Sequence, residues 1–358
     1  MKKIKAIDLF CGSGGTTSGL KKSGIDVYAA VEIDKVASET YQYNNPEVKL
    51  IQSDIRDVSC LDFPDINRDE NYLMLVACPP CQGFSTIRNG GEDDERNELI
   101  FEYERLILEL KPDFLLMENV SGMMGKKGKK IFDRFYNNIK NQYDIVYDVL
   151  NAADYGVPQQ RKRLVLHGIK KKFFLKNLSL PDKTHSKDGD GGKLPWVNAD
   201  VIMDLPPIHA GESYQGPLEI FNHISNGLSE KNIERIRIIR NGNGSRSSLP
   251  DSLKLNCHRN SAGHSDVYGI LDVNKPSVTI TGGCMSYSKG RFGHPTQDRA
   301  LSAREAARLQ SFDDDYIFFG NRVDLAKQIG NAVPVRLAQA SGNYFVSLAR
   351  VISNGKCE

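Results

Sequence analysis

The first 170 residues alternate between short apolar runs and amphipathic stretches, and this alternation constrains the fold more than any other feature. Short apolar runs are typical of buried strands, and apolar residues at helical spacing are typical of helices that cover a sheet. Strands that alternate with helices predict an α/β fold with a mostly parallel sheet and helices on both faces. The predicted strands are 5–10, 26–31, 48–52, 72–77, 114–117, 145–150 and 164–169, and the predicted helices lie within 15–22, 98–110 and 127–141.

The regular pattern stops after Lys172. Residues 177–274 show little periodicity and are rich in Gly, Pro, Ser and Asn, which indicates a smaller, loop-rich domain. A strand over 278–281 and a helix over 303–310, capped by Ser302, are predicted next.

The C-terminal part predicts an apolar helix over 335–351, which needs a sheet to cover and is expected to return to the first domain. The predicted domains are therefore 1–176 completed by 324–358, and 177–323.

Composition and charge exclude several classes of protein. No apolar run approaches the roughly 20 residues of a membrane span, and Asp8 interrupts the apolar start, which indicates a strand rather than a signal peptide. Seven irregularly spaced cysteines favour a reducing cytoplasm. The net charge of +2 is too small to indicate a nucleic-acid partner by itself, so any basic surface must be local.

A Gly-rich turn over 11–15 joins the first predicted strand to the first helix, as in nucleotide-type sites. Its spacing is not Gly-x-Gly-x-x-Gly, so the turn alone is weak evidence. Glu32 ends the second strand about 20 positions after the turn, where a carboxylate suits the two hydroxyls of a ribose. The alternative for Glu32 is an exposed residue beside the start of a helix.

The segment 77–85, Ala-Cys-Pro-Pro-Cys-Gln-Gly-Phe-Ser, follows a buried strand and begins a Gly-rich loop. Cys81 sits directly after two prolines that end the sheet ladder. It can be a small core residue, half of a Cys-x-x-Cys site with Cys78, or a nucleophile. The other cysteines offer no second ligand pair for zinc, and no metal site is predicted.

A basic stretch lies inside the loop-rich region. Residues 231–259 carry seven basic and two acidic side chains, with an Asn/Gly-rich loop over 241–246. Such a loop suits contacts to phosphates, and Arg240 and Arg246 are the candidates. The alternative is an ordinary solvated surface.

Six segments together resemble the cytosine-5 DNA methyltransferase family, of the bacterial restriction-modification or orphan type. They occur in the family's order and cover nearly the whole chain outside 177–274. The segments are Asp-Leu-Phe-Cys-Gly-Ser-Gly-Gly (8–15), Pro-Pro-Cys-Gln-Gly-Phe-Ser (79–85), Glu-Asn-Val (118–120), Gln-Arg-Lys-Arg (160–163), Arg-Glu-x-x-Arg-Leu-Gln (304–310) and Gly-Asn-Ala-Val (330–333). The resemblance implies the Rossmann-like fold of S-adenosylmethionine-dependent methyltransferases.

The resemblance also implies a cofactor, S-adenosyl-L-methionine, with S-adenosyl-L-homocysteine as product. Glu32 is expected to bind the ribose hydroxyls, with Ile33 against the adenine ring and Asp54 at its edge. The remaining residues expected to bind the cofactor are Phe10, Gly12, Gly14, Ile55, Pro80, Leu99, Asn331 and Ala332.

The implied chemistry is nucleophilic. The Cys81 thiolate is expected to add to carbon 6 of cytosine, and protonated Glu118 to hydrogen-bond N3. Arg163 is expected at O2 of the base, and Arg161 is expected to orient Glu118 or the loop. The cytosine must leave the duplex, so Gln82 is expected in the vacated stack, with Ser85 or Arg88 at phosphate.

The implied partner is double-stranded DNA, recognised through 177–274. A cognate restriction endonuclease that forms no stable complex, a monomeric state and a cytoplasmic location at the nucleoid are further expectations, and no membrane association is expected. Two departures from the family pattern are Cys78, where relatives often have Gly, and Ala332, where they often have Ser.

Three other functions compete with this prediction. A tRNA cytosine-5 methyltransferase shares the motifs but usually has a shorter variable region. A nicotinamide-dependent oxidoreductase does not explain Pro-Pro-Cys-Gln or Glu-Asn-Val. A DNA-binding regulator without activity would not need both Cys81 and Glu118.

Overall fold

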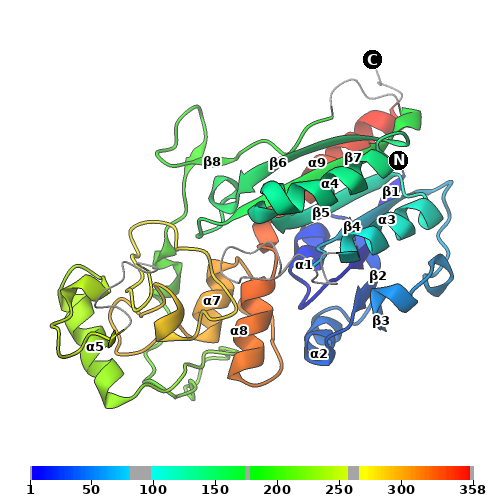
Figure 1. Ribbon diagram of the computed structural model, residues 1–358. Coiled ribbons are helices and arrows are strands. Elements are labelled where there is room, and N and C mark those ends of the chain that lie inside the picture. Colours follow the sequence, from blue (N-terminus) through cyan, green and yellow to red (C-terminus); the bar gives the residue numbers. More distant parts are fainter. Residues whose placement is uncertain (1, 81–97, 174–177, 257–265, 355–358) are drawn as a thin grey trace. The chain divides into compact units, whose positions relative to one another are not determined.

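The structure is a computed structural model that describes residues 2–80, 98–173, 178–256 and 266–354 (Figure 1). The chain forms two compact units. The first unit comprises Met1–Tyr155, Lys162–Lys183 and Val333–Glu358, and the second comprises Gly156–Arg161 and Thr184–Ala332. Residues 324–332 thus belong to the second unit, whereas the sequence pattern grouped them with the first domain.

The first unit is built on a seven-stranded sheet with the order β3-β2-β1-β4-β5-β7-β6. Strands β3, β2, β1, β4 and β5 are parallel to one another, and β7 is antiparallel to both of its neighbours. This confirms the predicted mostly parallel sheet. The strands are β1 (Lys3–Leu9), β2 (Asp26–Glu32), β3 (Lys49–Gln52), β4 (Asn71–Ala77), β5 (Phe114–Val120), β6 (Tyr143–Asn151) and β7 (Lys162–Lys170).

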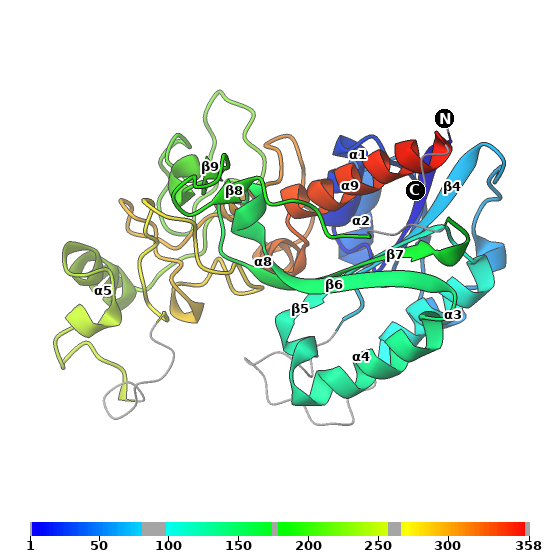
Figure 2. The same cartoon turned by 90° about the horizontal axis from the view of Figure 1, so that it is seen from above.

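Helices cover both faces of this sheet. Figure 2 shows α1 and α9 on one face and α3 and α4 on the other. The helices of the unit are α1 (Gly15–Lys22), α2 (Lys35–Asn44), α3 (Leu99–Leu110), α4 (Lys126–Ile139) and α9 (Val335–Ser353). Among the residues that the structure describes, no helix combines the length and the apolar character needed to cross a membrane.

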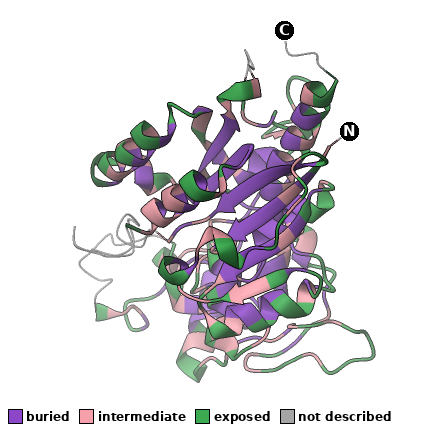
Figure 3. Ribbon diagram, turned by 90° about the vertical axis from the view of Figure 1, so that its right-hand side faces the viewer, coloured by how far each residue is buried: buried purple, intermediate pink, exposed green. Residues whose placement is uncertain are grey.

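The sheet is buried because its central strands are apolar on both sides. Every residue of β4 is buried, and in Figure 3 the strands of the sheet are mostly purple, the colour of buried residues. Helix α3 buries Ile100, Tyr103, Leu106 and Ile107 against the same core. It ends at Lys111, whose left-handed φ of 47° precedes Pro112, a residue that cannot continue the helix.

The apolar C-terminal helix lies in the first unit and packs against α1. The two helices approach closely at Gly19. A Cβ there would lie 2.4 Å from the Val335 carbonyl oxygen and 2.6 Å from the Ala338 Cβ. Residues far apart in the sequence therefore complete one layer over the sheet.

The second unit has little regular structure. Its strands are β8 (His185–Ser186) and β9 (Leu194–Pro195), and its helices are α5 (Glu230–Asn241), α7 (Ala303–Leu309) and α8 (Arg322–Asn331). Its apolar core comprises Ile236, Ile239, Leu249, Leu253, Ile270, Tyr287 and Ala300. The loop-rich texture is as predicted, but α5 lies where no periodicity was recognised.

Two local predictions in this unit have different outcomes. Ser302 does cap α7, since its Oγ accepts from the Glu305 N–H at 3.1 Å and Glu305 accepts from the Ser302 N–H at 2.7 Å. The predicted strand 278–281 is wrong. The Ile280 N–H donates to the Gln159 side-chain oxygen at 2.9 Å, so a side chain takes a bond that a strand ladder would use.

Candidate active site

The turn after β1 shapes one end of the site. The chain turns through left-handed conformations at Phe10, Gly12 and Gly14, whose φ values are 57°, 53° and 89°. The two glycines adopt such conformations without strain. A Cβ on Gly12 would meet nothing within 4 Å, so the turn borders open space. Gly14 then precedes α1 as its N-cap, with no side-chain hydrogen bond, and the first turn of that helix is buried.

Glu32 ties this turn to the end of β2. Its carboxylate accepts the Gly12 N–H at 2.8 Å, the Asp34 N–H at 2.8 Å and the Ile33 N–H at 3.0 Å. Burial raises the pKa of the Glu32 carboxyl. A carboxylate oxygen has more than one lone pair, so Glu32 retains acceptor capacity for a hydroxyl group.

The residues predicted around an adenine ring differ in exposure. The Ile33 side chain is 63% exposed, and Ile55 is buried. Asp54 accepts the Arg56 backbone N–H at 3.0 Å and pairs with the Arg56 guanidinium at 2.6 Å, which lowers the pKa of the Asp54 carboxyl. Leu99 is half-buried at the start of α3 and packs against the core.

These features fit an adenosyl cofactor. Glu32 offers an acceptor for a ribose, exposed Ile33 offers apolar surface for a flat ring, and the space beside Gly12 admits a close approach of the ligand to backbone. All three belong to the first unit, at the carboxyl ends of parallel strands.

Beneath the turn lies a buried carboxyl group that the sequence pattern did not single out. Asp8 is fully buried, accepts the Thr17 hydroxyl at 2.7 Å, and has its pKa raised to about 7 by burial. Between about pH 4 and pH 7 the folded protein therefore retains a proton that the unfolded chain releases, so Asp8 makes the protein less stable as pH rises through this range.

We expect Asp8→Asn to remove this pH dependence, because the amide keeps the shape and carries no charge. Relative to wild type, the variant should gain on the order of 2 kcal/mol in free energy of unfolding between pH 5 and pH 8. Urea unfolding without ligands measures the difference, with exposed Asp65→Asn as the control. Parallel curves for Asp8→Asn and wild type across this range would contradict the assignment.

The end of β5 holds the predicted acidic residue. Glu118 Oε1 lies 2.9 Å from Arg163 Nε, and both side chains are about seven-eighths buried, at 14% and 13% exposure. The pair forms because Val120 lies opposite Arg163 in the β5–β7 ladder, which sets Glu118 and Arg163 diagonally on one face. Asn119 points the other way and donates to the Pro79 carbonyl oxygen at 3.1 Å.

Cys78 and Glu118 line the same small cavity. The Cys78 sulfur is 3.7 Å from the Thr16 hydroxyl, and burial, followed by the charge of Glu118, raises the pKa of the thiol well above its ordinary value. A thiol held protonated in this way is a poor nucleophile or metal ligand at neutral pH. The structure therefore gives Cys78 a packing role.

Four predicted site residues lie outside the described residues: Cys81, Gln82, Ser85 and Arg88. Pro79 and Pro80, which lead into Cys81, are described. Pro79 is buried and bonded to Asn119, and Pro80 is half-buried. Pro80, the last described residue before Cys81, therefore lies near the carboxyl ends of the paired strands β4 and β5.

The sequence and the fold are both shared with known proteins. A family model of the C-5 cytosine-specific DNA methylases matches residues 4–346. The chain belongs to the C-5 cytosine-specific DNA methylase family. It is a DNA (cytosine-5-)-methyltransferase that uses S-adenosylmethionine, as the sequence motifs predicted.

Similar proteins cover the chain almost completely. Type II methylase M.HgiDII of Herpetosiphon aurantiacus is 34% identical over 93% of this chain and 92% of its own length. Type II methyltransferase M1.HphI of Haemophilus parahaemolyticus is 34% identical over 93% of this chain and 84% of its own length. A solved E. coli structure, described as a prophage-encoded DNA modification methyltransferase, is 28% identical with a TM-score of 0.69 over 97% of this chain and 100% of its own. Spodoptera frugiperda DNMT2, at 19% identity with a TM-score of 0.60 over 98% of this chain and 100% of its own, shares the fold.

In the second unit of the methylase, Arg161 binds backbone. Its guanidinium, 2% exposed, donates to the carbonyl oxygens of Ile280 at 2.6 Å, Gly330 at 3.0 Å and Ala332 at 3.2 Å. Arg163 pairs with Glu118, so the two predicted catalytic arginines have different surroundings. The contacts of Arg161 indicate that it ties two backbone segments, at Ile280 and at 330–332, to its own.

The predicted motif begins at Gln160 and does not include Gln159. Gln159 is fully buried and donates to the Leu309 carbonyl oxygen at 3.0 Å and to the Gln310 side-chain oxygen at 2.8 Å. Gln310 in turn donates to the Ile329 carbonyl oxygen at 2.7 Å. The local sequence offers one signal, a glutamine two positions before Arg161. The hydrogen-bond partners of Gln159 are about 120 to 150 residues away in the sequence, so this signal does not identify them.

Two of the predicted DNA contacts, Arg240 and Arg246, and the last two predicted cofactor residues lie in the second unit. Arg240 pairs with Asp298, which also pairs with Arg237 at 2.6 Å, so a phosphate at Arg240 would compete with an existing ion pair. Arg246 is half-buried where the loop over 241–246 ends. Asn331 and Ala332 end α8, with Asn331 exposed.

Proposed function

We propose that the methylase acts on one cytosine within a specific duplex DNA sequence, through a covalent adduct between Cys81 and carbon 6. The observation that carries this proposal is the arrangement at the carboxyl end of β5. There Glu118 pairs with Arg163 while Asn119 holds the Pro79 carbonyl, two residues before Cys81. A base placed against Glu118 would face both an acid and a neighbouring cation.

Each side chain has a separate task. The Cys81 thiolate adds to carbon 6, which breaks the aromaticity of the ring and makes carbon 5 nucleophilic. Bound S-adenosylmethionine supplies the electrophilic methyl group. Glu118 hydrogen-bonds N3 as electron density develops there, and Arg163 hydrogen-bonds O2. Loss of the carbon-5 proton then lets the thiolate leave, which regenerates Cys81.

Protonation of Glu118 has to compete with its ion pair. Arg163 at 2.9 Å favours the ionised carboxylate, whereas an ionised carboxylate against N3 would place acceptor against acceptor. We infer that the flipped cytosine displaces part of this ion pair, so Glu118 gains a proton and Arg163 turns to O2. Arg163 thus pairs with Glu118 in the free enzyme and hydrogen-bonds the base when cytosine is bound.

The cytosine must leave the base stack to reach this site, at a cost of a few kcal/mol. Gln82 is proposed to fill the vacated position, and Ser85 or Arg88 to contact phosphate. Residues 177–274 are proposed to read the sequence, which assigns target recognition to the second unit and methyl transfer to the first. The enzyme would act as a monomer and protect DNA from a restriction endonuclease of the same specificity.

Replacing residues 177–274 with the equivalent region of a relative should move methylation to the donor's sequence. Bisulfite sequencing of DNA from cells expressing the chimera reads out the methylated cytosines. Methylation that stays at the original sequence would show that specificity resides in the first unit.

Arg240 and Arg246 should contribute through phosphates. Neutralising both should weaken DNA binding and reduce the slope of log K against log salt by about 1 for each phosphate that the protein no longer neutralises. Exposed Lys187→Ala, outside the basic stretch, is the control. An unchanged slope would remove these two arginines from the DNA interface.

A further inference from the structure

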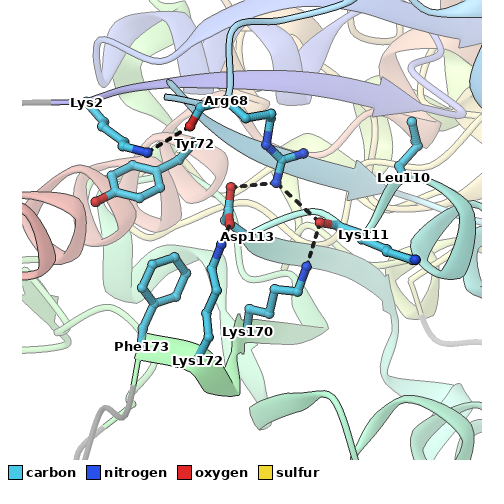
Figure 4. A pocket seen from close by; sticks show the side chains of 9 residues that line it. All are labelled: Lys2, Arg68, Tyr72, Leu110, Lys111, Asp113, Lys170, Lys172 and Phe173. Carbon is cyan, nitrogen blue, oxygen red and sulfur yellow. Dashed lines mark hydrogen bonds and ion pairs between the residues drawn. The ribbon is translucent and has the colours of Figure 1, made fainter. Parts of the chain in front are cut away.

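A second pocket lies in the first unit at the amino ends of β1, β4 and β5, the edge of the sheet opposite the methyl-transfer site. Seven-residue strands separate the two edges by roughly 20 Å. The pocket has a volume of about 460 Å³. Its lining residues are Lys2, Arg68, Tyr72, Leu110, Lys111, Asp113, Lys170, Lys172 and Phe173 (Figure 4).

Positive charge is concentrated in this pocket. Five cationic side chains and one carboxylate line it, a net charge of +4, whereas the whole chain carries +2. The cations come from four separate parts of the sequence, at residues 2, 68, 111 and 170–172. Folding therefore gathers charges that the sequence keeps apart.

The single carboxylate is already satisfied. Asp113 is 3% exposed; one carboxylate oxygen accepts Arg68 Nη2 at 2.8 Å and the Leu73 N–H at 3.0 Å, and the other forms an ion pair with Lys172 Nζ at 2.7 Å. Figure 4 shows Asp113 between Arg68 and Lys172. This cluster anchors the starts of β4 and β5, and it accounts for two of the five cations.

The other three cations have no anionic partner among the residues that the structure describes. Lys2 Nζ donates to the Arg68 carbonyl oxygen at 2.7 Å, and Lys170 Nζ donates to the Lys111 carbonyl oxygen at 3.1 Å. The Lys111 ammonium has no hydrogen-bond partner within the described ranges. Since each ammonium has three donors, several charged N–H groups remain for a ligand.

The like charges also act on one another. Burial, and then the charge of Lys172, lower the pKa of the Lys170 ammonium. An anion at this position would remove the repulsion between Lys170, Lys172 and Lys111, so the protein gains more from binding an anion here than at a single surface lysine.

We propose that this pocket binds a small anion bearing several phosphate groups. Lysine ammonium groups are compact point charges that suit phosphate oxygens, and Lys2, Lys111 and Lys170 line this one pocket from three separate parts of the sequence. A concave site of this volume suits a compact polyphosphate, whereas a duplex presents its phosphates on a convex surface. The site is distant from the methyl-transfer site and does not depend on the proposed mechanism.

Calorimetric titration of the full chain with inorganic tripolyphosphate tests the proposal. Wild type is expected to bind one equivalent, with an affinity that falls as salt rises. The double variant Lys111→Met/Lys170→Met should bind about tenfold more weakly, since it loses two charged groups and keeps the Asp113 cluster. Its methyl transfer to DNA should stay at the wild-type rate.

The matched control is Lys126→Met/Lys130→Met, which removes two exposed lysines from α4 with the same change in charge. It should bind tripolyphosphate as wild type does. The proposal would be overturned if wild type showed no saturable binding of tripolyphosphate at about 1 mM, or if both double variants bound tripolyphosphate equally weakly. It would also be overturned if Lys111→Met/Lys170→Met bound tripolyphosphate as wild type does but no longer bound a short DNA duplex.

Discussion

Cys81→Ser is expected to reduce methyl transfer to below about one thousandth of the wild-type rate, because a serine hydroxyl is far less nucleophilic than a thiolate. Binding of S-adenosylmethionine and DNA should remain, since the substitution is nearly isosteric and Pro79 and Asn119 stay in place. Single-turnover assays with labelled cofactor measure the rate.

DNA carrying 5-fluorocytosine at the target provides the second measurement. Fluorine at carbon 5 cannot leave as a proton does, so the wild-type adduct should persist through denaturing electrophoresis. The matched control is Cys60→Ser, at a free cysteine of the first unit, which should be trapped like wild type. Trapping of Cys81→Ser at the wild-type level would assign the nucleophile to another residue.

Glu118→Gln is expected to slow methyl transfer by about 10²-fold, the low end for a positioned acid. The amide keeps the shape and still donates a hydrogen bond to N3, but it delivers no proton and loses the ion pair with Arg163. Base flipping should be retained, whereas Glu118→Ala should lose both flipping and transfer. Fluorescence of 2-aminopurine beside the target reports flipping, and single-turnover rates report transfer.

The control for the two Glu118 variants is Glu39→Gln, the same change at an exposed position of α2. Rates are compared with DNA and cofactor at saturation, so that weaker binding does not count as slower chemistry. A Glu118→Gln enzyme as fast as wild type would show that proton donation from this residue is not required.

Much of the first unit was predictable because its signals are local. Apolar runs gave the strands, and the all-buried β4 is the clearest case. Helix α3 was predicted from its apolar spacing and from Pro112, and it spans Leu99–Leu110. The Gly-rich turn and Glu32 were predicted from their order in the sequence, and in the structure the Gly12 N–H donates a hydrogen bond to the Glu32 carboxylate.

Long-range polar contacts were not predictable. Gln159 was missed because its role depends on the Leu309 carbonyl and the Ile280 N–H, which no local pattern announces. Asp113 and the lysines around it were missed for the same reason, since parallel strands bring distant residues to one edge. The strand over 278–281 was predicted from β-branched residues, but a side chain took its backbone bond.

The most direct test of the proposed function is transfer of labelled methyl groups from S-adenosylmethionine to purified duplex DNA and, in parallel, to tRNA. We predict 5-methylcytosine in the duplex, at one cytosine of a defined sequence, and no label in tRNA. Label in tRNA alone, or a methyl group on any atom of the DNA other than carbon 5 of cytosine, would contradict this function.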